Sequence, residues 1–200
     1  GDVYKRQLMK RAHEAGAEDF DEIFDSGVET VIQQTEILRR IASEFSSFGR
    51  VSNLSLEAIP VSGFLEDFTA AYRGADKVRI TVESAGGAAC LADRESLRKI
   101  LVNLLENALD AMQHEGDILV TSESRDGYVY IRVIDSGPGL SPESEERLFE
   151  PYFSTKTNGT GLGLAISQSL AREMDGEIRI TNRVGASGVQ AMLKLPLAGG

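Results

Sequence analysis

Two asparagines stand four positions apart in a segment with helical apolar periodicity, residues 97–112. Asn103 and Asn107 leave the same face of a helix, because side chains at positions i and i+4 lie one above the other. Asparagine is a mediocre helix former, so two of them in a helix interior call for a reason. An amide oxygen is a hard neutral ligand suited to Mg²⁺, which takes its other oxygens from water and phosphates. A solvated helix face explains the pattern equally well, so for this helix alone both interpretations stay open.

A carboxylate with two glycines close behind it is the second candidate. Asp135 ends a strand-like run and is followed by Ser136-Gly137-Pro138-Gly139. The carboxylate can accept a hydrogen bond from an exocyclic amine while the glycine loop wraps a ring. Adenine offers such an amine, whereas guanine presents a carbonyl oxygen at the corresponding edge. A plain turn has the same composition, so the loop alone is weak support.

A second glycine loop opens an apolar helix. Gly159, Gly161 and Gly163 let the backbone approach a ligand closely, and the helix N-terminus offers free N–H groups to phosphate oxygens. The loop does not follow directly on a strand, which argues against a dinucleotide-binding βαβ unit. The P-loop pattern G-x-x-x-x-G-K-S/T does not occur in the sequence.

Strands and helices must position these loops, and periodicity with turn residues predicts them. Asp93 is the expected N-cap of the asparagine helix, and Asp126-Gly127 predicts a hairpin. The stretch between Asp135 and the second glycine loop is expected to be irregular. The fold class is therefore α/β, a two-layer α/β sandwich whose mixed, largely antiparallel sheet is covered by helices on one face. The predicted strands are 78–82, 88–92, 118–122, 128–134, 178–182 and 189–195, and the predicted helices are 61–72, 93–112 and 161–174.

A long helix is expected ahead of this α/β region, over residues 18–48. Its apolar residues recur at alternating spacings of four and three, the a/d pattern of a helical bundle. Packing on the chain's own domain would explain the stripe as well. We favour dimerisation, because the segment lies outside the α/β region. The stripe consists of Phe24, Val28, Val31, Thr35, Leu38, Ala42 and Phe45.

Composition narrows the partners. A formal net charge of −10 and a pI near 4.8 argue against binding to nucleic acid, and against an anionic membrane surface. Phosphates of a nucleotide remain compatible with such a chain, because backbone N–H groups, a local lysine and a metal ion can hold them. Cys90 is the single cysteine, which favours a reducing, cytoplasmic compartment. No membrane span or signal peptide is recognisable, so membrane attachment is expected only through segments outside this sequence.

Taken together, five motifs in order resemble the ATP-binding domain of histidine kinases, type II topoisomerases, mismatch-repair ATPases and one class of chaperones. The asparagine helix resembles the family's N box, and the two glycine loops its glycine boxes. Residues 148–153 resemble its F box, and Gly185 to Gly188 its final glycine turn. Phe153-Ser-Thr-Lys156 points to sensor histidine kinases of the nitrogen-regulation type. The resemblance implies a catalytic domain over 54–198, and a partial dimerisation and phosphoacceptor region over 1–53.

The resemblance also implies ATP and Mg²⁺ as cofactors and a role for each site residue. Asn107 would ligate Mg²⁺, Asn103 would line the phosphate site, and Asp135 would hold the adenine amine. Lys156 is a candidate phosphate contact on a lid over 141–158, although a solvated loop lysine is an equally good interpretation. Asn103 and Lys156 are the expected catalytic residues. The remaining cofactor-binding candidates are Gly137 and Gly139 at the adenine pocket, and Thr160, Gly161, Leu162 and Gly163 at the phosphate side.

Asn103 bears on the reaction. Hydrolysing relatives have a glutamate there that activates water, and an amide cannot take that proton. The chain is therefore expected to pass the γ-phosphoryl group of ATP to a protein histidine, although Glu106 stays open as a base. His13 and His114 stand outside the His-Glu-x-x-Asn/Thr-Pro acceptor motif, so the acceptor is expected upstream of Gly1.

The expected partners are a second copy of the chain, through the N-terminal helix, and the receiver domain of a response regulator. Two alternatives remain. One is a serine-directed protein kinase of the anti-sigma type, against which the long N-terminal helix argues. The other is a non-enzymatic module in which ATP switches a dimer between conformations.

Overall fold

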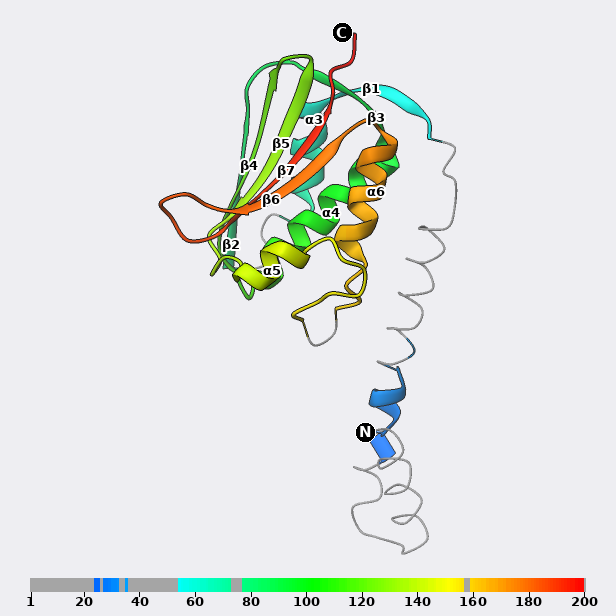
Figure 1. Cartoon of the computed structure of the whole chain (residues 1–200), viewed down its shortest axis with the longest axis vertical. Helices are drawn as coiled ribbons and strands as arrows, with labels where there is room; N and C mark the ends of the chain where they lie inside the picture. The colour runs from blue at the N-terminus through cyan, green and yellow to red at the C-terminus, as the bar shows by residue number, and fades with distance from the viewer. Residues whose placement is uncertain are drawn as a thin grey trace, which may run out of the picture. The chain divides into compact units, whose positions relative to one another are not determined.

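The computed structural model describes residues 24–25, 27–32, 35, 54–72, 77–156 and 159–199. The chain divides into two compact units, residues 1–47 and 48–200 (Figure 1). In the first unit the described residues are helical, and Phe24, Val28 and Val31 expose their side chains. The rest of the helix expected over 18–48, and His13, lie outside the described residues. The dimerisation role of this unit and its boundary at residue 53 stay predictions.

The second unit is built on a five-stranded sheet with the order β2-β4-β5-β7-β6. The pair β2–β4 is parallel and the other three pairs are antiparallel. A separate two-stranded sheet pairs β1 with β3. The mixed, largely antiparallel sheet expected from the sequence is thus confirmed. The strands are β1 (Leu56–Pro60), β2 (Lys77–Ser84), β3 (Ala89–Asp93), β4 (Glu115–Arg125), β5 (Tyr128–Asp135), β6 (Glu177–Asn182) and β7 (Val189–Pro196).

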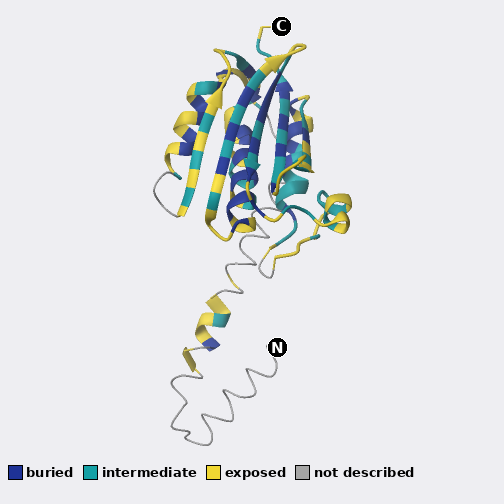
Figure 2. Cartoon of the chain, turned by 90° about the vertical axis from the view of Figure 1, so that its left-hand side faces the viewer, coloured by how far each residue is buried: buried dark blue, intermediate teal, exposed yellow. Residues whose placement is uncertain are grey.

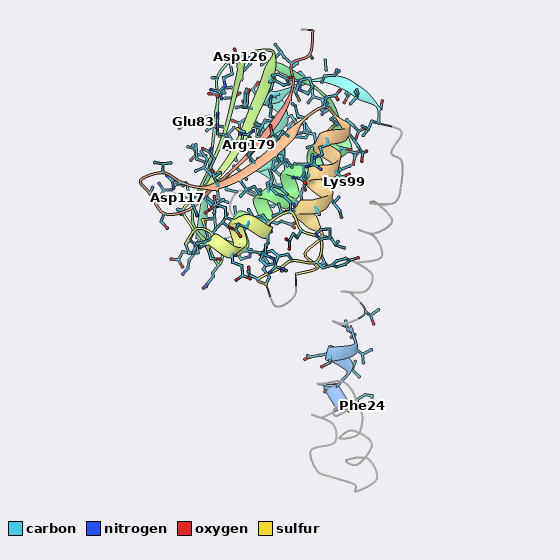
Figure 3. All side chains as sticks on the ribbon, viewed as in Figure 1. Phe24, Glu83, Lys99, Asp117, Asp126 and Arg179 are labelled. Atoms are coloured by element: carbon cyan, nitrogen blue, oxygen red, sulfur yellow. The ribbon has the colours of Figure 1, made fainter. Side chains whose placement is uncertain are left out.

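Helices cover one face of this sheet (Figures 1 and 2). They are α3 (Val61–Ala70), α4 (Arg94–Ala111) and α6 (Gly163–Glu173). Strand residues alternate in burial, with Ile118 and Val120 buried and their neighbour Leu119 only partly so. The core therefore lies between the sheet and the helices, while charged side chains such as Glu83, Asp117 and Arg179 project from the outside (Figure 3). The apolar side of α4 expected from its periodicity is buried as predicted: Leu97, Ile100, Leu101, Leu104, Leu105, Ala108 and Met112.

Local sequence explains where the main elements begin and turn. The Asp93 carboxylate caps α4 by accepting a hydrogen bond from the Ser96 N–H, 2.8 Å away. Asp126 and Gly127 both adopt positive φ angles, of 51° and 78°, which closes the β4–β5 hairpin. These predictions are confirmed. Among the described residues, no helix is long and apolar enough to cross a membrane.

The stretch after Asp135 was expected to be irregular, and this prediction is wrong in part. A short helix, α5 (Pro142–Arg147), lies within it. Ser141 caps this helix through its side chain, Pro142 occupies its first turn, and Arg147 lies in its last turn. The local signals of Ser-Pro-Glu were present, but the nearby prolines and glycines outweighed them in our interpretation.

Candidate functional site

Asp135 ends β5, and its side chain is buried with 4% exposure. Its Oδ1 accepts hydrogen bonds from the backbone N–H groups of Gly137, at 2.8 Å, and Val189, at 3.1 Å. In the described part of the chain, both hydrogen bonds to the carboxylate end on Oδ1. The second oxygen, Oδ2, is therefore the one that could accept a hydrogen bond from a ligand amine.

The glycine loop after Asp135 is held by the end of β6. The Asn182 amide accepts from the Leu140 N–H at 2.7 Å and donates to the Leu140 carbonyl at 3.0 Å. Ser187 Oγ donates to the Gly137 carbonyl at 2.6 Å. At Gly139, φ is +90° and a Cβ would lie 2.8 Å from Asn182 Oδ1, so this position suits only glycine.

Our interpretation of the sequence missed Asn182 and Ser187 as loop supports. The available signal was their place at the turn from Gly185 to Gly188: Asn182 stands just before this turn and Ser187 lies within it.

The polar face of α4 carries a chain of hydrogen bonds. Asn103 Nδ2 donates to Ser167 Oγ on α6 at 2.9 Å, and Asn107 Nδ2 donates to Asn103 Oδ1 at 3.3 Å. Lys156 Nζ donates to Asn107 Oδ1 at 2.7 Å and to Asp110 Oδ2 at 2.7 Å. An ammonium group only donates, so this contact directs the Asn107 oxygen toward the lysine and the nitrogen toward Asn103. The structure therefore brings the predicted residues Asn103, Asn107 and Lys156 together.

The second glycine loop lies against the same helix. A Cβ on Gly163 would lie 2.5 Å from Asn103 Oδ1, so the first residue of α6 must be glycine for Asn103 to keep its place. Gly161 has φ of +68° and accepts a hydrogen bond from the Tyr152 N–H at 3.0 Å. Thr160 Oγ1 accepts from the Leu162 N–H at 3.3 Å, and the Leu162 side chain is 6% exposed.

Helix α4 joins the two loops into one site. A Cβ on Gly137 would lie 3.4 Å from the Met112 side chain and 3.7 Å from the Ala111 backbone, at the C-terminal end of α4. Gly163 contacts the same helix nearer its middle, at Asn103. The buried carboxylate of Asp135 and the polar row on α4 are therefore supported by one rigid element. This arrangement suits a ligand with a ring at one end and charged oxygens at the other.

The two phenylalanines of residues 148–153, the segment that resembles the F box, have different surroundings. Phe149 packs against the hydrophobic core, and the guanidinium of Arg147 lies 4.3 Å from the centre of the Phe153 ring. Burial raises the pKa of the Tyr72 phenol, and the negative charge of Glu106 raises it further.

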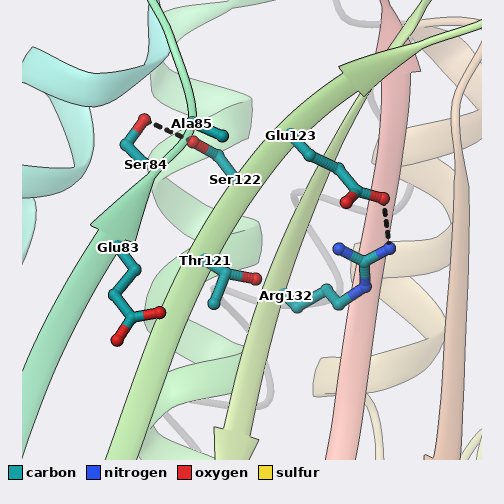
Figure 4. Close-up of a pocket in the computed structure, with 7 residues that line it drawn as sticks. All are labelled: Glu83, Ser84, Ala85, Thr121, Ser122, Glu123 and Arg132. Atoms are coloured by element: carbon teal, nitrogen blue, oxygen red, sulfur yellow. Dashed lines mark hydrogen bonds and ion pairs between the residues drawn. The ribbon is translucent and has the colours of Figure 1, made fainter.

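A hollow of about 450 Å³ lies elsewhere, on the sheet (Figure 4). Its lining includes Glu83, Thr121 and Arg132, which are neighbours in the strand register of β2, β4 and β5. Thr121 alternates with the buried Val120, so these side chains lie on the sheet face opposite the helices. None of the predicted site residues lines this hollow.

Residues 92–199 match the family model described as histidine kinase-, DNA gyrase B- and HSP90-like ATPase. The chain belongs to this family. The matched region contains α4, both glycine loops and the last two strands. Domains of this family bind ATP. The relatives named in the next paragraph confirm the predicted relationship to sensor histidine kinases. The domain is of the histidine kinase catalytic type.

Nitrogen regulation protein NtrY of Azorhizobium caulinodans is 32% identical over 186 residues, which cover 89% of this chain and 24% of that protein. Sensor histidine kinase ZraS of Salmonella typhi is 30% identical over 166 residues, covering 80% of this chain and 36% of that protein. The chain thus spans about a quarter to a third of the length of these two curated relatives.

Solved structures agree with the fold. The catalytic domain of histidine kinase ThkA, in a nucleotide-free form, matches with a TM-score of 0.66 and 28% identity, over 72% of this chain and 96% of that one. Full-length ShkA in complex with AMPPNP matches with a TM-score of 0.68 and 26% identity, over 90% of this chain and 38% of that one. The predicted α/β sandwich is therefore the fold of histidine kinase catalytic domains.

Proposed function

We propose that this domain transfers the γ-phosphoryl group of ATP to a histidine on a dimerisation helix, from which it passes to an aspartate of a response regulator. The observation that carries the proposal is the row Asn103, Asn107 and Lys156, which lies beside the second glycine loop on the helix that also supports Asp135. Two amides and one ammonium suit the binding and neutralisation of phosphate oxygens. None of these three groups can act as a base for water at neutral pH.

The adenine end of the proposed site is Asp135. Its Oδ1 is held by two backbone amides, so Oδ2 is directed by a rigid frame and would accept the exocyclic amine of adenine. Gly137 and Gly139 would leave room for the ring, since a side chain at either position would meet Asp135 or Asn182. Guanine would place a carbonyl oxygen against the carboxylate, and this unpaired contact predicts a preference for ATP over GTP.

The phosphate end is the row on α4 together with the second glycine loop. Asn107 would contribute its amide oxygen to Mg²⁺, which supplies charge neutralisation when bound. Asn103 would line the phosphates, and Lys156 would pair with them. Thr160, Gly161, Leu162 and Gly163 would form the turn that brings free N–H groups of α6 to the phosphate oxygens.

Phosphoryl transfer needs little from the protein beyond position and charge. The bond between the γ-phosphorus and its bridging oxygen breaks as the histidine nitrogen attacks in line from the opposite side. The side chains of Asn103 and Lys156 would hold the transferring group, with no general base for water among them. The second copy of the chain would bind through the helix over 18–48.

The experiment uses radiolabelled ATP. The chain alone should bind Mg·ATP and form little or no acid-labile phosphate, because His114 follows α4 outside any acceptor motif and the residues after His13 lack the proline of the motif. A second protein that carries a helix pair with the His-Glu-x-x-Asn/Thr-Pro motif should become labelled in trans. A non-enzymatic switch would bind ATP and label neither protein. Stoichiometric label on His13 would show a self-sufficient kinase and refute our assignment of the acceptor.

A further inference from the structure

Lys156 reaches back to α4 from the loop after Phe153. Its Nζ lies 2.7 Å from Asn107 Oδ1 and 2.7 Å from Asp110 Oδ2. Asp110 stands one helical turn beyond Asn107, so the amide and the carboxylate share a face and flank one ammonium group. Asp110 is not among the site residues predicted from the sequence, because it follows the asparagines as an ordinary polar residue of an exposed helix face.

The carboxylate is the partner that gives this contact its charge. Asn107 is neutral, and Asp110 forms an ion pair with Lys156 in which both side chains are about half exposed, Asp110 at 46% and Lys156 at 41%. A second ionisable group near Asp110 is His114, whose Nε2 lies 3.7 Å from Oδ1, the oxygen that Lys156 does not use. Asp110 therefore anchors the lysine while the second hydrogen bond of the ammonium group ends on Asn107.

The oxygen that receives this second hydrogen bond is the one that we assign to Mg²⁺. An ammonium group at 2.7 Å from Asn107 Oδ1 and a divalent cation bound to the same oxygen would be like charges within contact distance. Only one of them can occupy that oxygen. Lys156 would therefore have to leave Asn107 for a metal ion to bind there, and nucleotide phosphates would be a stronger partner for it than a half-exposed carboxylate.

We propose that Asp110 is a positioning residue that holds Lys156 on the metal-ligating oxygen of Asn107, so that binding of the metal nucleotide proceeds by exchange of one cation for another. This inference rests on the proposed function, because it takes Asn107 as the metal ligand. The exchange also moves the loop. The Lys156 side chain joins the 153–156 segment to Asn107 and Asp110 on α4, so its release loosens the segment from the helix. Within the segment, the backbone N–H of Lys156 donates to Ser154 Oγ at 3.1 Å.

The test compares Lys156→Gln, Asp110→Asn and the double variant with the unchanged chain. ADP binding is titrated by calorimetry across a series of Mg²⁺ concentrations, which yields the Mg²⁺ concentration for half-maximal tightening. ADP is chosen because it lacks the γ-phosphate, which would favour movement of Lys156 away from Asn107. Each single variant should lower this Mg²⁺ midpoint by about two- to fivefold, the range for a half-exposed ion pair. The double variant should add little, because both changes remove the same contact.

Arg179→Gln is the matched control. Arg179 forms an exposed ion pair with Glu177 at 2.7 Å on β6, the same length as the Lys156–Asp110 pair, and it lies outside the site. This variant removes the same charge and should leave the Mg²⁺ midpoint unchanged. Hydrogen exchange without nucleotide supplies a readout independent of the metal: amides of residues 153–156 should exchange faster in Asp110→Asn and not in Arg179→Gln.

Three results would overturn the inference. An unchanged Mg²⁺ midpoint in both single variants would show that Lys156 does not compete with the metal. A midpoint raised by Asp110→Asn would make Asp110 a partner of the metal and not of the lysine. Unchanged hydrogen exchange would show that the ion pair does not hold the loop. If the unchanged chain binds ADP with no Mg²⁺ dependence, the metal assignment in the proposed function fails first.

Discussion

Gly188 lies against the backbone carbonyl of Asp135 so closely that a Cβ on the glycine would overlap the carbonyl oxygen. The φ angle of Gly188 is +111°, a conformation that other residues rarely adopt. Arg183 Nη1 donates to the same carbonyl at 3.1 Å. Val189, which follows Gly188, donates its N–H to the Asp135 carboxylate. The start of β7 and the end of β5 are thus locked together at the proposed adenine contact.

Replacement of this glycine should damage both the fold and nucleotide binding. Gly188→Ala combines a positive φ with a backbone overlap and should lower the free energy of unfolding by about 3 kcal/mol. Gly185→Ala is the control, since Gly185 also has a positive φ, of +74°, but open space around its Cβ position. Gly185→Ala should lower the free energy of unfolding by only about 1 kcal/mol. Urea denaturation measures the loss of stability in the two variants, and equal losses would contradict the role of the Asp135 contact.

Asp135 should decide the choice of nucleotide. Asp135→Ala should abolish detectable ADP binding, while Asp135→Asn should weaken it by about 10- to 100-fold, the value of one charged hydrogen bond. Calorimetry with ADP and GDP measures both effects. Asp117→Asn, on an exposed carboxylate that pairs with Arg79, should change neither. Equal affinity of the unchanged chain for ADP and GDP would refute the assignment.

Asn107 should act on the metal and not on the fold. Asn107→Ala removes a half-buried amide from the polar face of α4, whereas the apolar face of the helix stays intact. The variant should lose most of the Mg²⁺ dependence of ADP binding with little change in thermal unfolding. Cooperative unfolding at a much lower temperature, with metal-dependent binding retained, would make Asn107 structural.

Ser167 should support Asn103. Ser167 is 2% exposed and its hydroxyl accepts a hydrogen bond from the Asn103 amide, so Ser167→Ala leaves that donor without this partner. We expect a loss of about 1–2 kcal/mol in the free energy of unfolding and weaker ADP binding. Ser169→Ala, two positions along α6, removes only an exposed hydroxyl contact to Glu173 and should be nearly neutral. The same small effect from both variants would show that Asn103 needs no such support.

Cys90 should make stability fall at alkaline pH. Burial raises the pKa of its thiol to about 11 from a reference value of 9.0. Between these values the unfolded chain loses the thiol proton and the folded chain keeps it, so unfolding is favoured as pH rises. The thiol should contribute at most about 1.4 kcal/mol per pH unit to this slope, so the slope should be smaller in Cys90→Ala, where the raised pKa of Tyr72 still contributes. Urea denaturation from pH 8 to pH 11 measures it, and equal slopes for both chains would contradict the shift.

Sequence by itself determined the elements whose signals are local. The apolar periodicity and the Asp93 cap predicted helix α4, and Asp126-Gly127 predicted the β4–β5 hairpin. The glycine loops and the asparagine pair could be found for the same reason, because backbone freedom and helical spacing are properties of neighbouring residues. Helix α5 shows the limit of local signals, since its cap competed with nearby prolines and glycines.

Tertiary structure alone decided which distant side chains meet. Lys156 contacts Asp110 across 46 positions, Asn182 holds Leu140 across 42, and Arg183 reaches the Asp135 carbonyl across 48. No periodicity links such pairs, because each depends on how a loop returns to the sheet or helix that it left. The residue types predicted that phosphate and metal could be bound, but the packing of loops on α4 selected Lys156 and Asp110 as partners.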